Sequence, residues 1–243
     1  MKITTLVNIS EKPVTLISQS IRLEIDTPAR GILNIKTDEQ IERGQLVEVA
    51  MQLGNEQAHY VFVGFIESIT PSHTNGYQIL VRELAALLNR RVAISLQHCT
   101  AKDIVSEISA QTGAHFVLPD SAWTKKDLPR YQHIGGGYSA LDYLLRAFDV
   151  QSPIWQQQPN GTIYVGELEK SLMGSKAINI ESEVFSNIGI AGGELPTMPR
   201  LRPGIKIKIN GHEKQIASID INNEIMRLGW VENLHDEKLR GIQ

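Results

Sequence analysis

The sequence contains a single cysteine, Cys99, among 243 residues. It therefore cannot form an intramolecular disulfide or hold a metal in a cage of thiolates. We expect Cys99 to pack as a small buried hydrophobic residue. The chain also lacks a surplus of basic charge, because its formal net charge is -3. A dedicated nucleic-acid binder neutralises phosphates with lysine and arginine, so we expect no specific nucleic-acid partner.

Long apolar runs are missing as well. No segment approaches the roughly 20 apolar residues that span a bilayer, and the N-terminus has no apolar signal-peptide core. We expect no stable membrane insertion, no signal peptide and a cytoplasmic product. The hydrophobic fraction of 42% and the charged fraction of 21% are typical of a folded protein, and the length favours more than one domain.

Motifs that carry chemistry are also absent from the sequence. The seven histidines show no metal-ligand spacing, and no nucleophile elbow, phosphate-binding loop or dinucleotide fingerprint occurs. His98 and Cys99 are adjacent, so on a strand they point to opposite faces. The glycines at 135–137 precede a helix, and we interpret them as a flexible loop rather than a phosphate cradle. We predict no catalytic, cofactor-binding or metal-binding residues.

Two other functions have weak support in the sequence. Glu167 and Glu169 lie one strand repeat apart, as carboxylates of a glycosidase or cell-wall hydrolase can, but a solvated face explains them better. Trp123, Trp155 and Trp230 offer sugar-stacking platforms, although packing in or beside a core is the simpler interpretation. A carbohydrate- or receptor-binding protein is thus one alternative, and a hydrolase is a less favoured one.

The clearest pattern that is present lies between residues 198 and 230. Ile205, Ile207 and Ile209 alternate with Lys206 and Lys208, as in a strand with one buried face. The pair Asn210-Gly211 that follows tolerates the positive φ angles of a tight hairpin turn. A second turn at 222–223 leads to Trp230, so the segment predicts a meander of three strands.

Strand patterns also dominate the first third of the chain. Apolar alternation predicts strands at 3–9, 14–25, 47–53, 58–69 and 77–81, with a turn at 72–76. Residues 60–66 are apolar on both faces, which predicts a strand covered on both sides. Pro28 and Gly31 interrupt the pattern, so we expect a polar turn or excursion between the second and third of these strands.

Helical periodicity appears in the middle of the chain. Leucines near 84–88 predict a short helix, and Thr100 with Asp103 predicts the capped start of a helix over 101–112 that ends at Gly113. Ser139 and Asp142 are expected to cap a further helix that buries apolar residues at helical spacing. Those residues are Leu141, Leu144, Leu145 and Phe148. A hairpin over 154–167 follows.

These patterns divide the chain into three blocks. Residues 1–95 are mostly β, residues 96–175 form an inserted α+β block, and residues 176–243 are a β block expected to pack with the first. The predicted fold class is α+β and predominantly β.

Several of the motifs resemble those of baseplate or tail hub proteins of tailed bacteriophages, especially the Mu-like group. The run VRELAALLNRRVAISLQHCTAKDIVSEISAQTGAHF carries a short leucine-rich helix and a T-x-x-D-I helix that ends in T-G. The run GYSALDYLLRAFDVQSPIWQQQPNGTIYVGELE carries an S-A-x-x-x-L helix and an N-G hairpin. The L-R-P-G of residues 201–204, followed by alternating isoleucines and a later tryptophan, is similar to the returning barrel of that family.

The resemblance implies two β-barrel domains of the tail-tube type, 1–95 and 176–243, on either side of the α+β domain 96–175. It further implies a homotrimeric ring in the virion tail that joins the tail tube or a distal tail protein to a spike or tip protein. Hub proteins of this group are usually longer than this chain, which ends in the polar segment 233–243. We expect subunit or tube contacts at Tyr60, Phe62, Phe65, Lys206 and Lys208. We expect structural turns at Asn160, Gly161, Pro203, Gly204, Asn210 and Gly211.

Overall fold

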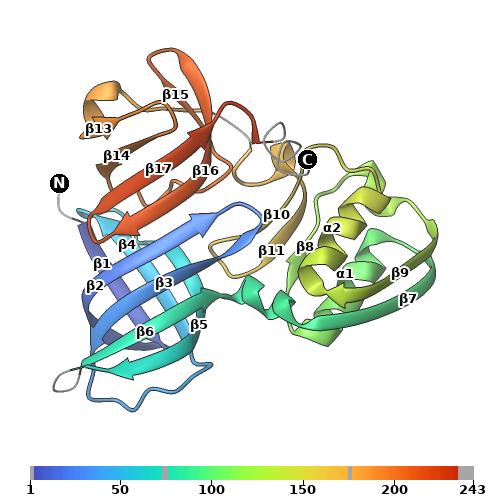
Figure 1. Cartoon of the computed structure of the whole chain (residues 1–243), viewed down its shortest axis with the longest axis horizontal. Coiled ribbons are helices and arrows are strands. Elements are labelled where there is room, and N and C mark those ends of the chain that lie inside the picture. Colours follow the sequence, from blue (N-terminus) through green and yellow to red (C-terminus); the bar gives the residue numbers. More distant parts are fainter. Residues whose placement is uncertain (1–2, 73–75, 175–176, 235–243) are drawn as a thin grey trace. The chain divides into compact units, whose positions relative to one another are not determined.

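The computed structural model describes residues 3–72, 76–174 and 177–234 (Figure 1). The chain divides into two compact units, of which the first joins Met1–Glu83 to Lys176–Gln243 and the second is Leu84–Ser175. The first unit is therefore built from both ends of the sequence. Part of the turn expected at 72–76, and most of the polar C-terminal segment, lie outside the described residues.

The N-terminal half of the first unit is a closed antiparallel barrel of six strands. Its strands are β1 (Ile3–Ile9), β2 (Lys12–Glu24), β3 (Thr27–Lys36), β4 (Leu46–Leu53), β5 (His59–Pro71) and β6 (Gly76–Glu83). They follow the order β1-β4-β5-β6-β3-β2, and pairing of β1 with β2 closes the ring. Alternate side chains fill the interior, and Val47, Val49 and Met51 are each 0% exposed. The half-buried strand predicted at 47–53 is confirmed.

Strand β3 replaces the polar excursion that we predicted after residue 26, so that prediction is wrong over 27–36. Pro28 lies near the beginning of the strand, beside an irregularity in the pairing of β2 with β3, so its missing N–H breaks no regular ladder. A Cβ on Gly31 would lie 3.1 Å from Ile21 and 3.2 Å from Val81, so a glycine fits closely between β2 and β6. Gly31 therefore marks tight packing within a strand, and Pro28 marks an irregular start of that strand.

The C-terminal half of the first unit is a second set of strands that shares a sheet with the barrel. Its elements are β12 (Ile178–Asn179), η4 (Ser182–Val184), β13 (Asn187–Ile188), β14 (Gly192–Pro196), β15 (Lys206–Ile209), β16 (His212–Asn222) and β17 (Ile225–Val231). Strand β16 pairs with β17 on one side and with β2 on the other, as Figure 1 shows. The predicted meander is confirmed. Pairing among the described residues does not link β12 to β13, so this half is not closed by hydrogen bonds.

The hairpin between β15 and β16 has the backbone geometry of a tight turn. Asn210 and Gly211 have φ angles of 49° and 84°, which asparagine and glycine adopt at least cost. Ile205, Ile207 and Ile209 are at most 7% exposed, while Lys208 is exposed. Farther back, Gly204 has a φ of 94° and donates its N–H to the Ile216 carbonyl at 2.7 Å.

The second unit packs two helices against short strands. Its elements are η1 (Leu84–Asn89), β7 (Arg91–Cys99), α1 (Ala101–Thr112), β8 (Phe116–Val117), η2 (Ala122–Lys125), β9 (Leu128–Gly136), α2 (Gly137–Ala147), β10 (Pro153–Gln157), β11 (Ile163–Glu167) and η3 (Leu168–Lys170). The hairpin predicted over 154–167 is confirmed as β10 and β11, and Gly161 in its turn has a φ of 84°. The predicted fold class, α+β and predominantly β, is confirmed.

Helix α1 begins and ends where the sequence predicts. The Thr100 side chain and the Asp103 carboxylate form a reciprocal capping box, which satisfies free N–H groups of the first turn. Gly113 ends the helix in the left-handed conformation with a φ of 80°. Ile104 and Ile108 are buried at 0% exposure.

Helix α2 begins earlier than predicted. Its N-cap is Gly136, so the capping role expected of Ser139 is wrong, and Ser139 Oγ instead donates to the Gly136 carbonyl at 2.9 Å. Gly135 and Gly136 belong to strand β9, where they pair with Val92 and Arg91, so the flexible loop expected there is also wrong. A Cβ on Gly137 would lie 2.8 Å from the Leu88 carbonyl oxygen, so close backbone packing explains this glycine.

Candidate functional site

The predicted contact residues on β5 differ in how far they reach the surface. Tyr60 is 44% exposed, Phe65 is half-buried, and Phe62 is only 1% exposed. Val63, on the same face of β5 as Phe65, is also buried at 7%, and Val61, beside the irregularity in the pairing with β4, is buried at 2%. The chain itself therefore covers residues 61–63, whereas Tyr60 and Phe65 reach the surface, and their contacts with a subunit or the tube stay a prediction. Phe62 does not reach the surface.

The two predicted lysines lie on the outward side of β15. Lys208 is exposed and Lys206 is half-buried. Across the hairpin, Lys214 forms an ion pair with Glu232 at 3.3 Å. These lysines lie on the C-terminal half of the first unit, whereas the β5 residues lie on the barrel. Their role in assembly stays a prediction.

A row of charged side chains crosses six neighbouring strands on the outer face of the first unit. Residues directly opposite one another in a sheet point to the same face, so the register defines the row. Its members, from β14 through β17, β16, β2 and β3 to β6, are Glu194, Arg227, Asp220, Arg22, Arg30 and Arg82. The row crosses the junction between the two halves of the unit, where β16 pairs with β2.

Most charges in this row are paired. Arg227 contacts Glu194 at 3.1 Å, and Arg22 contacts Asp220 at 3.2 Å and Glu24 at 2.6 Å. The Glu24 hydrogen bond and the nearby Asp220 raise the pKa of Arg22 above its ordinary value. At the other end, Arg82 contacts Glu67 at 3.2 Å. These pairs are partly exposed, so each contributes at most about 1 kcal/mol to stability.

Arg30 differs from its neighbours in the row. It is exposed and forms no ion pair with any described residue, although Arg22 and Arg82 lie directly opposite it on the two adjacent strands. Like charges in directly opposed positions destabilise a sheet. Beside it, Ile32 is 43% exposed and Leu80, its cross-strand partner on β6, is half-buried. This part of the barrel wall, which we name the arginine wall, comprises Arg22, Arg30, Ile32, Leu80 and Arg82.

The opposite end of the row borders a hollow of about 360 Å³. Gly192, Gly229 and Ser218 lie opposite one another on β14, β17 and β16, so this part of the outer face has almost no side chains. A Cβ on Gly192 would run into the backbone carbonyl oxygen of Leu228, which explains that glycine. Glu194 and Asp220 are among the other lining residues. The hollow is a gap in a sheet surface, with both carboxylates already paired.

A carboxyl group is buried inside the first unit. Glu83, the last residue of β6, is 5% exposed and accepts a hydrogen bond from the Ala29 N–H at 2.7 Å. Burial raises the pKa of Glu83 to about 7, although the Ala29 N–H and the charge of Arg202 act in the opposite direction. Arg202 is also buried and donates to the Tyr60 carbonyl at 2.7 Å. This arginine therefore attaches the segment before β15 to strand β5.

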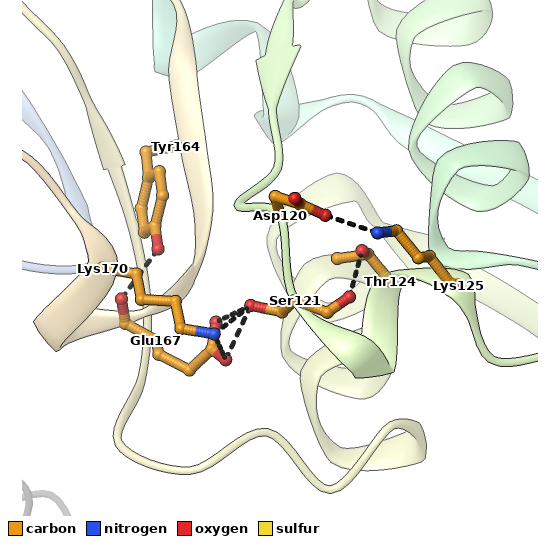
Figure 2. Close-up of polar contacts among 7 residues, drawn as sticks. All are labelled: Asp120, Ser121, Thr124, Lys125, Tyr164, Glu167 and Lys170. Carbon is orange, nitrogen blue, oxygen red and sulfur yellow. Dashed lines mark hydrogen bonds and ion pairs between the residues drawn. The ribbon is translucent and has the colours of Figure 1, made fainter.

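The second unit contains a polar network around Glu167, shown in Figure 2. Ser121 Oγ lies 2.9 and 3.1 Å from the two Glu167 carboxylate oxygens, and Lys170 Nζ lies 2.7 Å from Ser121 Oγ and 3.3 Å from Glu167. Tyr164 donates its hydroxyl to the Glu167 carbonyl at 2.7 Å. The side chain of Glu167 is 17% exposed, so the solvated face that we predicted for it is wrong.

The geometry of this network indicates a structural role and not a catalytic one. A serine nucleophile needs a base strong enough to take its proton, whereas Ser121 donates to a carboxylate whose pKa is lowered, and Lys170 is a donor to both Ser121 and Glu167. Burial alone would raise the pKa of Glu167, yet the neighbouring Trp123 N–H, its own backbone N–H, Ser121 and Lys170 lower it. Trp123 Nε1 has no partner at hydrogen-bonding geometry, so it acts on the carboxylate as a nearby dipole. The contacts hold the turn at Ser121 against the end of β11.

The remaining candidates for chemistry are packed. Trp155 and Trp230 are 3% and 5% exposed, and Trp123 packs against Phe148 with ring centroids 5.7 Å apart. Cys99 is 2% exposed, and burial raises its pKa. Among the described residues, no three histidine, cysteine or acidic side chains converge as metal ligands do. No helix in the described part of the chain is long and apolar enough to cross a membrane.

The sequence alone does not predict the row of charged side chains or the burial of Glu83 and Arg202, for different reasons. Glu83 continues the inward alternation of Ile79 and Val81, and this phase was a usable signal for a buried carboxyl. Arg202 lies in a segment without periodicity, so nothing in the pattern indicates its burial. The row depends on strand order, because β16 meets β2 across almost 200 residues of sequence, and local patterns do not encode that pairing.

Comparison with known proteins places the fold. No family model matches the chain. An uncharacterized 58.7 kDa protein of Haemophilus phage HP1 is 25% identical over 221 residues, which cover 90% of this chain and 41% of that protein. The chain thus spans about two fifths of the length of this relative.

Two solved structures have the same architecture over almost their whole length. The 43 kDa tail protein of prophage MuSo2 from Shewanella oneidensis superposes with a TM-score of 0.72 at 11% identity, covering 95% of this chain and 97% of that one. A tail protein from Neisseria meningitidis gives a TM-score of 0.68 at 13% identity, covering 96% and 97%. The chain therefore has a phage tail-protein fold, and the predicted resemblance to phage tail proteins is confirmed in fold.

Proposed function

We propose that the chain is a structural component of a bacteriophage tail, and that three copies form a ring that joins the tail tube to a tip or spike protein. The observation that carries this proposal is the similarity in fold to tail proteins over 95% of the chain, together with a sequence relative from a phage. The virion tail is accordingly the proposed location.

Two features of the first unit support the ring. Its two halves are both built mainly from antiparallel strands, so three chains would present six such walls around one axis. In addition, exposed apolar side chains occur on the barrel, including Leu6 at 46%, Ile17 at 65% and Ile32 at 43%. Exposed apolar groups of this kind suit contacts in an assembly.

The network around Glu167 and the packed tryptophans favour neither alternative function. A sugar-binding protein would be expected to expose an aromatic platform, and a hydrolase two convergent acids in a cleft. Glu169 is exposed, while Glu167 bonds to Ser121 and Lys170. The two acids therefore do not act as a pair.

The proposal is tested by light scattering on the purified chain, alone and mixed with tail-tube protein. We expect a trimer mass, or a complex containing three copies of this chain when the tube protein is present. A species that stays monomeric at high concentration in both conditions would contradict the ring.

A further inference from the structure

We propose that the arginine wall of one protomer binds an acidic and apolar segment on the C-terminal half of a second copy of this chain. The inference rests on the proposed ring and names the two surfaces that would meet in it. It is a heterologous contact, in which different surfaces of identical chains meet, and repeating such a contact gives a ring when the rotation between successive copies closes.

One arginine of the arginine wall, Arg30, has no ion-pair partner among the described residues of the protomer. Arg30 lies between Arg22 and Arg82 in cross-strand register, and those two have acidic partners while Arg30 has none among the described residues. Neighbouring strands are about 4.8 Å apart, so three guanidinium groups crowd one strip of the surface. A carboxylate from outside the protomer would relieve this repulsion and accept the planar hydrogen bonds that arginine offers.

The surface beside Arg30 is apolar. Ile32 is 43% exposed on the same face of β3, and its cross-strand partner Leu80 is half-buried. At the β5 edge of the same row, Phe65 lies opposite Arg82 and is half-buried. Arginine and aromatic residues are enriched at the centre of protein interfaces, which are depleted of other charged residues. The wall therefore fits a partner that carries carboxylates next to apolar side chains.

A segment of the C-terminal half has that complementary composition. Glu181 and Glu183 are exposed and form no ion pair with a described residue. In the same segment, Ile188 is 45% exposed and Ile190 is 97% exposed. The chain thus carries both an arginine–apolar wall and a carboxylate–apolar segment, and we name the latter the acidic segment, residues 181–190.

The backbone of the acidic segment is held in place before any partner binds. The Trp230 indole donates to the Ile190 carbonyl at 2.9 Å, and the Trp230 backbone N–H donates to the Ala191 carbonyl at 3.0 Å. The Gly189 N–H donates to the Gly192 carbonyl at 2.8 Å. A segment fixed in this way loses little conformational freedom on binding, which favours its use as an anchor.

Charge reversal on the full-length chain tests the contact. Arg30→Glu should weaken self-association at least about tenfold, measured by sedimentation velocity over a concentration series, because it replaces attraction by repulsion. The same change removes the like-charge contacts on β3, so the melting temperature of the protomer should stay the same or rise. Lys36→Glu is the matched control, since Lys36 is exposed on the same face of β3 about 20 Å along the strand. It should leave association unchanged.

Charge reversal on the acidic segment tests whether this segment is the partner of the arginine wall. Glu181→Lys combined with Glu183→Lys should also weaken association at least about tenfold, and combining all three reversals in one chain should restore it. A trimer that persists unchanged in Arg30→Glu would overturn this inference and leave the ring standing. Loss of tail-tube binding with the trimer intact would assign the wall to the tube protein instead. A wild-type chain that is monomeric alone and with tube protein would overturn both proposals.

Discussion

At the scale of single residues, the buried carboxyl of Glu83 makes the stability of the first unit depend on pH. The pKa of Glu83 is raised to about 7 in the folded chain by burial, whereas an unfolded chain ionises glutamate near 4.5. Between these values the unfolded state binds fewer protons than the folded state. The stabilising contribution is thus complete below about pH 4.5 and is lost as the pH rises through about 7.

We expect Glu83→Gln to remove this pH dependence while it keeps an acceptor for the Ala29 N–H. The difference in the free energy of unfolding between the wild type and the variant should shift by about 3 kcal/mol between pH 4.5 and pH 8, to the disadvantage of the wild type. Urea unfolding at several pH values measures it. Glu67→Gln, at a half-buried surface ion pair, is the control and should show a much smaller shift. A difference independent of pH would mean that Glu83 is not a buried acid.

At the scale of elements, the close approach of strands β5 and β6 explains the glycine at position 64. The irregularities in the pairing of β5 lie on either side of it, opposite Val49/Ala50 and at Ile66/Ser68, while Gly64 pairs regularly with Val47 and Glu83. A Cβ at this position would run into the carbonyl oxygen of Arg82 and lie 2.8 Å from the Phe62 ring. Backbone atoms cannot move aside as a flexible side chain can.

Gly64→Ala should therefore destabilise the barrel by about 3 kcal/mol or more, measured as a shift of the urea midpoint at an unchanged slope. Gly189→Ala is the matched control, because its Cβ would lie 3.6 Å from the nearest atom, in ordinary contact. We expect that variant to change stability by less than about 1 kcal/mol. Equal effects of the two substitutions would show that β5 and β6 can separate to make room.

Elements also show how far the sequence determines the structure. Helix α1 follows from local chemistry, since Thr100, Asp103 and Gly113 specify both of its ends. Strand β3 is not predicted because Pro28 and Gly31 are ordinarily turn residues; in the structure Pro28 lies at an irregularity in the pairing with β2, and Gly31 fits between β2 and β6. Ser139 is not the N-cap because α2 follows directly on strand β9, where Gly136 pairs with Arg91, and no local pattern contains that pairing.

At the scale of the whole molecule, the second unit interrupts the first in sequence. The first unit joins both ends of the chain, and the inserted unit, Leu84–Ser175, has its own core. Its buried side chains include Leu88, Ile104, Ile108, Leu141 and Leu144, each 0% exposed. The division into three domains at 95/96 and 175/176 stays a prediction.

We expect residues 84–175, expressed alone, to fold cooperatively, because their core contains both helices and the strands that cover them. Circular dichroism and a single sigmoidal urea transition would show this. Leu141→Ala in the fragment should lower its stability by about 3 kcal/mol, whereas Lys102→Ala on the exposed face of α1 should have little effect. A fragment without a cooperative transition would show that the inserted unit depends on the rest of the chain.

The proposed ring is tested most directly by electron microscopy of the purified chain mixed with its tail-tube protein. We expect particles with threefold symmetry at the end of the tube, each containing three copies of the chain. The two β halves of each copy are joined by the pairing of β16 with β2. Three copies should therefore contribute six walls around the axis. Monomers that do not associate with the tube, or a ring of a different symmetry, would contradict the account.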